Sequence, residues 1–217
     1  SRAEESYAFV YGSDTSPGNL FFSKTNFEES SLLAGSFKTL DEANMVSSEV
    51  IRFESFDGLE IPSILYKPKG ASASNPAPVM VYVHGGPGGQ TRKGFNSQIQ
   101  YMLHHGYGIL GVNNRGSSGY GAEFYHLDDK RHGQEDLQDI IASKEYLQSL
   151  SWVDDNKIGV MGGSYGGFMT LAALTFYPDV FNVGIDIFGV SNWVRTLLTI
   201  LGGTNFMCLL LSLTLSK

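Results

Sequence analysis

Short runs of aromatic and β-branched residues open the chain. Residues 6–11 and 19–23 are such runs, and a turn-rich segment from Gly12 to Gly18 separates them. This pattern predicts an antiparallel pair of strands. The stretch from about 24 to 45 is polar and irregular, so it predicts no element.

A second pair of runs follows at 50–53 and 61–66, joined by Asp57-Gly58. Asp-Gly between two such runs is a strong signal for a β-hairpin. Residues 68–78 are rich in Pro, Gly, Ala, Ser and Asn, a composition typical of a loop.

From residue 79 onward, continuous apolar runs alternate with segments of helical spacing. Continuous runs are typical of strands buried on both faces. The predicted elements are strands at 79–83, 107–112, 157–161 and 183–188, with helices at 96–105, 135–150 and 165–176 between them. Strands that alternate with helices imply right-handed crossovers and a mostly parallel sheet. We therefore predict an α/β domain opened by an antiparallel hairpin, with its last strand exposed as an aggregation-prone edge.

Bulk composition excludes some classes of function. The net charge is −7, and Lys130-Arg131 stands beside Asp128 and Asp129, so no basic stripe for nucleic acid is expected. Cys208 is the only cysteine, which excludes an intrachain disulfide or a cysteine-based metal site. A lone cysteine favours a reducing compartment such as the cytoplasm, although it does not fix the localisation.

Both ends of the chain are unusual. The chain opens with Ser1, without an initiating Met or a signal-peptide run, which is typical of a piece of a longer protein. Residues 201–217 form a divergent apolar tail in which the run 206–215 falls short of the ~20 residues that span a bilayer. Extending that run back to Trp193 includes Arg195, so we expect a buried or misfolded segment and no membrane partner.

The strongest chemical signal is the sequence from Gly162 to Gly167, which fits G-x-S-x-G around Ser164. It lies between a predicted strand and a predicted helix, the setting that a nucleophile elbow requires. Gly162, Gly166 and Gly167 would let strand and helix approach closely, and Ser164 Oγ would emerge at the helix N-terminus. The N–H of Tyr165 would point at a developing oxyanion. The alternative is a glycine-rich loop with an incidental serine.

A second glycine-rich loop, His84-Gly85-Gly86-Pro87, follows the strand predicted at 79–83. An HGG-type loop in this place supplies the other oxyanion donor in many esterases and lipases. We therefore predict an oxyanion role for the His84–Gly85 segment. His84 precedes Ser164, whereas the base comes last in the order Ser…Asp/Glu…His, so His84 is expected to position the loop rather than act as base.

No histidine follows Ser164 in these 217 residues, because the last of the five is His132. The only acidic residues after Ser164 are Asp179 and Asp186. A serine hydroxyl without a base stays protonated and is a poor nucleophile. The sequence therefore predicts an incomplete catalytic triad within this chain.

Three stretches together resemble the prolyl oligopeptidase family of serine peptidases. They are residues 83–87, 114–121 and 158–167, and the HGGP form is most similar to the acylaminoacyl-peptidase and dipeptidyl-peptidase branches. The resemblance implies a serine peptidase with an α/β-hydrolase fold, truncated here on its C-terminal side and preceded by β-propeller-like strands. It implies that residues 1–45 end a propeller module, that 46–200 are part of the catalytic domain, and that Ser164 is the nucleophile.

The resemblance also implies small peptides as substrates and no cofactor or metal. The family's Asp and His would lie beyond residue 217, and most of the propeller before residue 1. The loop 115–121 would lie near the site, either contacting substrate or forming a glycine-rich turn around a buried arginine. Two other functions stay open: an esterase or lipase on the same fold, which the propeller-like strands disfavour, and a catalytically dead fragment, which the missing base favours for the isolated chain.

Overall fold

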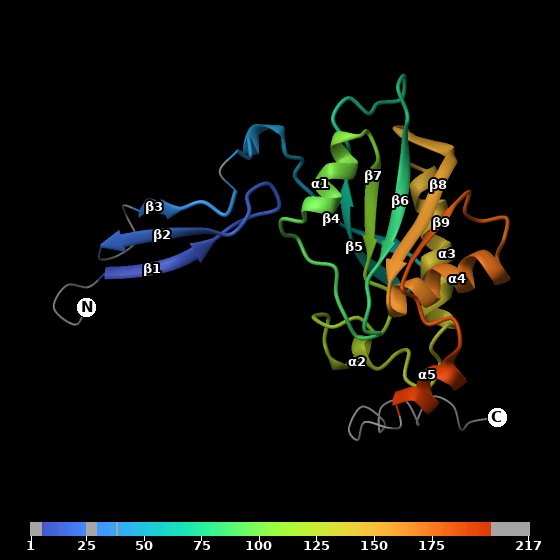
Figure 1. Ribbon diagram of the computed structural model, residues 1–217. Helices are drawn as coiled ribbons and strands as arrows, with labels where there is room; N and C mark the ends of the chain where they lie inside the picture. The colour runs from blue at the N-terminus through green and yellow to red at the C-terminus, as the bar shows by residue number, and fades with distance from the viewer. Residues whose placement is uncertain (1–5, 25–29, 38, 201–217) are drawn as a thin grey trace.

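A computed structural model describes residues 6–24, 30–37 and 39–200 of the chain. It contains a three-stranded sheet, in the order β1-β2-β3, and a six-stranded sheet, in the order β4-β5-β7-β6-β8-β9 (Figure 1). The strands are β1 (Ser6–Tyr11), β2 (Asn19–Lys24), β3 (Ser30–Ala34), β4 (Glu49–Glu54), β5 (Glu60–Tyr66), β6 (Ala77–Val83), β7 (Gly108–Val112), β8 (Val153–Gly163) and β9 (Gly184–Ile187). The helices are α1 (Ser97–His104), α2 (Ala122–Tyr125), α3 (Glu135–Gln148), α4 (Tyr165–Phe176) and α5 (Trp193–Ile200), with a 3-10 turn at Glu42–Asn44.

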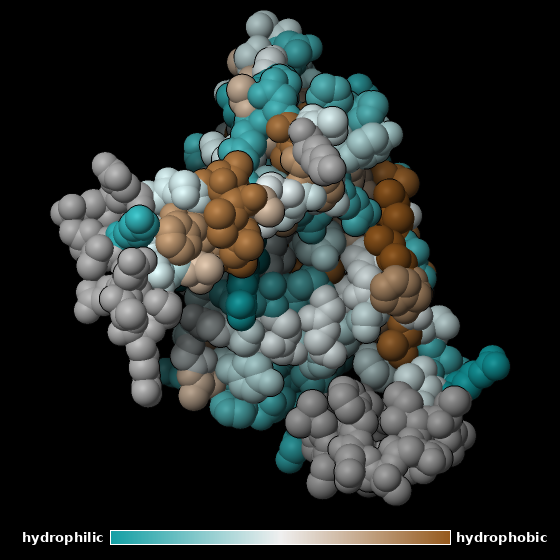
Figure 2. Space-filling model, turned by 60° about the vertical axis from the view of Figure 1, so that its left-hand side comes forward, coloured by the Kyte–Doolittle hydropathy of each residue, from teal (hydrophilic) through white to brown (hydrophobic). Residues whose placement is uncertain are grey.

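The three-stranded sheet stands to one side of the larger sheet (Figure 1). Strands β1 and β2 pair antiparallel, with Ser6 opposite Lys24, which confirms the first predicted pair. The prediction of no element between 24 and 45 is wrong, because β3 pairs with β2 there. All five residues of β3 are exposed, so no alternation of buried and exposed positions marks this strand in the sequence. Hydrophobic side chains reach the surface on this sheet, on the left of Figure 2, and they include Val10, Leu32 and Leu33.

The six-stranded sheet has the predicted mixed topology. The hairpin β4–β5 is antiparallel, as is the pairing of β5 with β7, whereas β7, β6, β8 and β9 run parallel. In the described residues β9 pairs only with β8, so it is an edge of the sheet; Ile185 within it and Val183 just before it are exposed. The described part therefore has the predicted edge strand.

Two hydrophobic cores cover the two faces of this sheet. Along β6 the alternation is complete, because Val79, Val81 and Val83 enter one core and Met80 enters the other. Helices α3 and α4 cover the first face, and α1 covers the second (Figure 1). The buried residues of the first core on the helices are Leu137, Ile140, Leu147, Met169, Ala172 and Ala173. The period of two along a strand thus produces three layers, helix–sheet–helix.

The predicted helices are present, and α4 has the predicted bounds. Asn96 caps α1, because its side chain accepts from the N–H groups of Gln98 and Ile99. Helices α2 and α5 were not predicted. No helix within the described ranges is long and apolar enough to cross a bilayer. The predicted tail at 201–217 lies outside the described residues.

Asp14 connects the smaller sheet to the larger one. Its buried carboxylate accepts from Ser48 N at 2.6 Å and Ser48 Oγ at 2.7 Å, and it pairs with Lys93 at 3.4 Å. Gln100 of α1 donates to the Asp14 carbonyl at 2.9 Å. The loop after β1 is therefore held against the α/β domain by one buried polar cluster.

Candidate active site

Ser164 occupies the turn between β8 and α4. Its backbone has φ 56° and ψ −116°, a conformation that L-residues rarely adopt and that costs about 1–3 kcal/mol. Ser164 N donates to the carbonyl of Ile187 in β9 at 3.1 Å, and the Ser164 residue is exposed. The fold thus holds a strained serine at the surface, directly at a helix N-terminus.

Glycines permit this turn because neighbouring backbone leaves no room for side chains. A Cβ on Gly166 would lie 2.1 Å from the carbonyl oxygen of Val83, and one on Gly162 would lie 2.5 Å from Gly166 C. A Cβ on Gly167 would lie 2.3 Å from the Asp186 carboxylate. The three predicted elbow glycines therefore allow β6, β8, β9 and α4 to meet at Ser164.

Tyr165 is the first residue of α4. The first hydrogen bond of the helix runs from Phe168 N to the Ser164 carbonyl, so the Tyr165 N–H is one of the N-terminal donors without a partner in the helix. The Tyr165 ring is buried, and its hydroxyl donates to the carboxylate of Asp136. Burial raises the pKa of Asp136 to about 6 and the pKa of Tyr165 well above its usual value. Asp136 was not among the residues predicted from the sequence, where its only signal is its place at the start of a predicted helix.

The His84–Gly85 segment lies beside Ser164. A Cβ on Gly85 would lie 3.5 Å from Ser164 Cβ and 4.0 Å from Ser164 Oγ. The His84 ring is buried, with Nδ1 2.9 Å from the Gly85 carbonyl and Nε2 2.8 Å from Ser117 Oγ. Burial lowers the pKa of His84, which favours the neutral ring. The ring nitrogens are therefore engaged within the loops around His84, while the Gly85 backbone faces the serine.

The other histidines are engaged away from Ser164. His126 pairs with Asp129 at 3.0 Å and His132 with Asp128 at 2.9 Å, while His104 and His105 lie on and just after α1. The described residues thus place no histidine in the position of a general base for Ser164.

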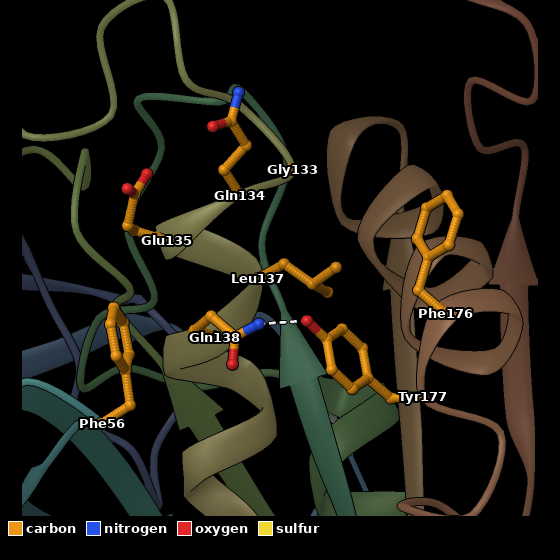
Figure 3. A pocket seen from close by; sticks show the side chains of 8 residues that line it. All are labelled: Phe56, Gly133, Gln134, Glu135, Leu137, Gln138, Phe176 and Tyr177. Atoms are coloured by element: carbon orange, nitrogen blue, oxygen red, sulfur yellow. Dashed lines mark hydrogen bonds between the residues drawn. The ribbon is translucent and has the colours of Figure 1, made fainter.

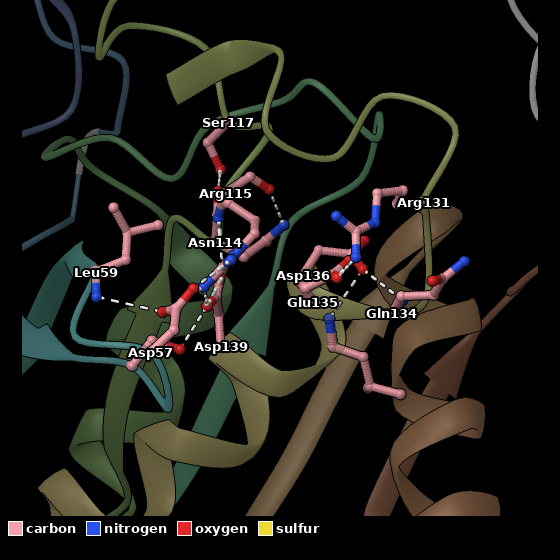
Figure 4. A network of polar contacts seen from close by, with 12 residues as sticks. Asp57, Leu59, Asn114, Arg115, Ser117, Arg131, Gln134, Glu135, Asp136 and Asp139 are labelled. Carbon is pink, nitrogen blue, oxygen red and sulfur yellow. Dashed lines mark hydrogen bonds and ion pairs between the residues drawn. The ribbon is translucent and has the colours of Figure 1, made fainter. Parts of the chain in front are cut away.

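Arg115 is buried rather than presented to solvent. Its guanidinium donates to Asp139 at 2.8–3.1 Å and to both carboxylate oxygens of Asp57 at 2.9 Å (Figure 4). It also stacks on Phe56, 5.0 Å from the ring centroid. Of the two alternatives for the loop 115–121, the geometry matches a glycine-rich turn around a buried arginine.

One hollow lies between α3 and α4 and has a volume of about 640 Å³. A hydrogen bond from Gln138 to the Tyr177 hydroxyl crosses it (Figure 3). A second hollow of about 420 Å³ lies between the connector near Leu40 and α1. Ser164 lines neither hollow, so neither is the substrate pocket of a Ser164 site.

Comparison with known proteins identifies the family. The model of the prolyl oligopeptidase family matches residues 93–207, which is more than half of the chain. The chain belongs to the prolyl oligopeptidase family. This confirms the resemblance seen in the sequence, and with it the α/β-hydrolase fold.

Individual relatives agree with this assignment. Dipeptidyl aminopeptidase BIII of Pseudoxanthomonas mexicana is 34% identical over 166 residues, which cover 74% of this chain and 24% of that protein. The acylaminoacyl peptidase of Pyrococcus horikoshii has a TM-score of 0.75 at 35% identity, over 89% of this chain and 31% of that chain. A puromycin-hydrolyzing peptidase of Mycobacterium tuberculosis has a TM-score of 0.81 at 25% identity, over 95% of this chain and 32% of that chain. The chain therefore spans roughly a quarter to a third of the length of these three relatives.

Proposed function

We propose that this chain carries the nucleophile of a serine peptidase, and that Ser164 forms an acyl-enzyme with the carbonyl carbon of a peptide bond. The observation that carries the proposal is the strained, exposed Ser164 between β8 and α4. A backbone strain of this size persists only where the surrounding structure enforces it. Here backbone from β6 and β9 encloses the turn.

Two groups beside Ser164 are proposed to stabilise the oxyanion. The first is the Tyr165 N–H at the start of α4, and the second is backbone of the His84–Gly85 loop. Gly85 supports this role because it lies against Ser164 without a side chain to block the approach of a carbonyl. Donors fixed before the reaction stabilise the developing charge without reorganisation. His84 is proposed to position the loop through its bonds to Gly85 and Ser117.

The general base is proposed to come from outside these residues. Relatives that match this chain are about three times as long or longer, which leaves room for an aspartate and a histidine in a longer protein. The domain boundary near residue 45 is proposed because the three-stranded sheet ends before it and the six-stranded sheet begins after it. The boundary near residue 200 is proposed from the sequence pattern alone.

Short peptides are the proposed substrates. The matching proteins are named for dipeptidyl aminopeptidase, acylaminoacyl peptidase and puromycin-hydrolyzing peptidase activities. An esterase on the same fold would differ in preferring short-chain esters to peptide amides. A panel of both substrate types, assayed on any longer form that contains these residues, separates the two.

A fluorophosphonate probe tests the nucleophile directly. The purified chain is incubated with the probe, with and without added imidazole as an external base, and the labelled peptide is mapped by mass spectrometry. We expect slow labelling of Ser164 that accelerates with imidazole above pH 7, where the added imidazole is largely neutral. Ser164→Ala should lose the label, whereas Ser118→Ala, a matched serine in another loop, should keep it.

Two results would contradict the proposal. Equal labelling of wild type and Ser164→Ala would place the reactive hydroxyl elsewhere. Fast labelling without imidazole that persists in His84→Gln would mean that a base other than His84 is already present, and the proposed external base would be wrong.

A further inference from the structure

Three side chains that the proposed peptidase chemistry does not use come together below the start of α4. They are Asp128 and His132, from the segment after α2, and Asp136, in the first turn of α3. We infer that Asp128, His132 and Asp136 form a binding site for a divalent transition-metal ion. The sequence predicted no metal, because cysteine ligands are absent and the family resemblance implies none.

The spacing of the three groups suits a single ion. One ligand atom from each residue lies within 4.8 Å of the others, and Asp128 Oδ2 lies 2.9 Å from His132 Nδ1. Ligands at ~2.1 Å from an ion are separated by ~3.0 Å when adjacent and ~4.2 Å when opposite in an octahedron. The Asp128–His132 distance thus matches an adjacent pair, and Asp136 needs at most a small inward movement.

Two of these atoms are buried without a hydrogen bond. The Asp128 side chain is 4% exposed, and its Oδ2 makes no hydrogen bond of good geometry; its close contact is His132 Nδ1 at 2.9 Å, which likewise makes none. The two atoms form an ion pair only when the His132 ring is protonated. A buried carboxylate oxygen in this state costs free energy unless something positive satisfies it. A divalent cation coordinated by both atoms would take the place of the ring proton and satisfy both.

The surroundings keep Asp128 in this place. A Cβ on Gly116 would lie 2.1 Å from Asp128 Cγ, so the carboxylate packs directly against glycine backbone. The nearby guanidinium of Arg131 pairs with Glu135 (Figure 4), so it does not neutralise Asp128.

Asp136 is fully buried and already well oriented. Its Oδ1 accepts from Gln134 N and Leu137 N, each at 2.9 Å, and its Oδ2 accepts from the Tyr165 hydroxyl. Each carboxylate oxygen has two lone pairs, so Oδ2 can still bind a cation. Two carboxylates balance the charge of a divalent ion.

The donor set indicates the class of metal. Ca²⁺ and Mg²⁺ prefer oxygen ligands only, whereas an imidazole nitrogen with two carboxylates suits Mn²⁺, Co²⁺ or Zn²⁺. The ion would also link the segment 126–134 to the nucleophile elbow. His132 stacks edge-on against Tyr165, with 5.6 Å between ring centroids, and Asp136 holds the Tyr165 hydroxyl.

Manganese titration of the chelator-treated 217-residue chain tests the site. Free Mn²⁺ is measured by electron paramagnetic resonance, and Mn²⁺ is chosen because thiols such as Cys208 bind it poorly. We expect one bound ion per chain and a Kd at least about tenfold weaker in Asp128→Asn and in His132→Phe, which keeps an aromatic ring against Tyr165. Asp129→Asn removes the same charge one residue along, from a side chain that is 62% exposed, and should leave the Kd unchanged.

If both variants unfold, Mn²⁺ binding to the wild-type chain still tests the site. Bound Mn²⁺ should broaden the amide NMR signals of His132 and Gly133 at lower metal concentration than those of α1. Absence of Mn²⁺ binding at about 1 mM, the weak end of biological cation sites, would overturn the inference. So would an equal Kd in all folded variants, or broadening that begins at α1.

Discussion

Replacing Arg115 by methionine removes the guanidinium that joins three segments of the α/β domain. Its partners are Asp57, in the turn of the β4–β5 hairpin, and Asp139, in α3. Methionine retains much of the apolar stem of arginine, so the change removes mainly the charge and its hydrogen bonds. The expected result is a large loss of stability.

The magnitude follows from the exposure of the two carboxylates. The Asp139 side chain is 0% exposed, and without the guanidinium it keeps only the Arg115 main-chain N–H at 2.8 Å and the Ser55 hydroxyl at 2.5 Å. Removing one partner of a buried ion pair costs about 3–5 kcal/mol, because it leaves an uncompensated buried charge. The Asp57 side chain is 39% exposed, so its pairing contributes at most about 1 kcal/mol. Arg115→Met should therefore cost about 3–5 kcal/mol, and Asp57→Asn about 1 kcal/mol or less.

Urea unfolding at pH 7, followed by far-UV circular dichroism, measures both changes. The double variant Arg115→Met/Asp139→Leu should recover part of the loss, because it removes the uncompensated buried charge but leaves Ser55 Oγ and the Arg115 N–H without their acceptor. Two outcomes would refute the reasoning. One is a cost below about 1 kcal/mol for Arg115→Met. The other is an equal cost for Asp57→Asn, which would mean that the exposed pair carries the stability.

Two further substitutions test the elbow and its supporting loop. Gly166→Ala should destabilise the chain by about 3 kcal/mol or more, because the new Cβ would lie 2.1 Å from the Val83 carbonyl oxygen. The control is Gly94→Ala, whose Cβ would have no atom within 4 Å and which should change the stability by less than about 0.5 kcal/mol. Equal melting temperatures of the Gly166→Ala and Gly94→Ala variants would contradict the close approach at Gly166. Burial holds the pKa of His84 below its usual 6.5, so its contribution to stability is complete above pH 6.5 and is lost as the pH falls through the lower folded-state pKa. The urea midpoint of the wild type should thus fall more steeply below pH 6.5 than that of His84→Asn. Parallel curves of midpoint against pH for the two proteins would contradict a lowered pKa of His84. His104→Asn, which changes an exposed histidine, is the control.

The strand, turn and helix around Ser164 were predictable because their signals are local. Glycines at 162, 166 and 167, together with the change from a continuous apolar run to helical spacing, determine the strand, the turn and the bounds of α4. The strain at Ser164 follows from the same glycines, since the tight approach they permit leaves the serine no ordinary conformation.

Other parts depend on contacts that no local pattern reveals. Strand β3 forms on the free edge of β2 although none of its residues is buried, so its signal is pairing rather than burial. Arg115 meets Asp57 across 58 positions and Asp139 across 24, and Tyr165 meets Asp136 across 29. Asp128, His132 and Asp136 are spaced by four, but this spacing predicts a shared face only within one helix, and α3 begins at Glu135.

The strained turn at Ser164 forms independently of any general base. Among the described residues, the contacts that surround the Ser164 turn come from the Val83 carbonyl, the Ile187 carbonyl and the packing of Gly167 on Gly189. None of those contacts involves a histidine side chain. The proposed nucleophile can therefore be held in position without a base, because its strained backbone is supported by sheet and helix packing rather than by a hydrogen bond to a histidine. In an enzyme built this way, loss of the base removes activation of the serine and leaves its position intact, which is why labelling and stability measurements report on different parts of the same site.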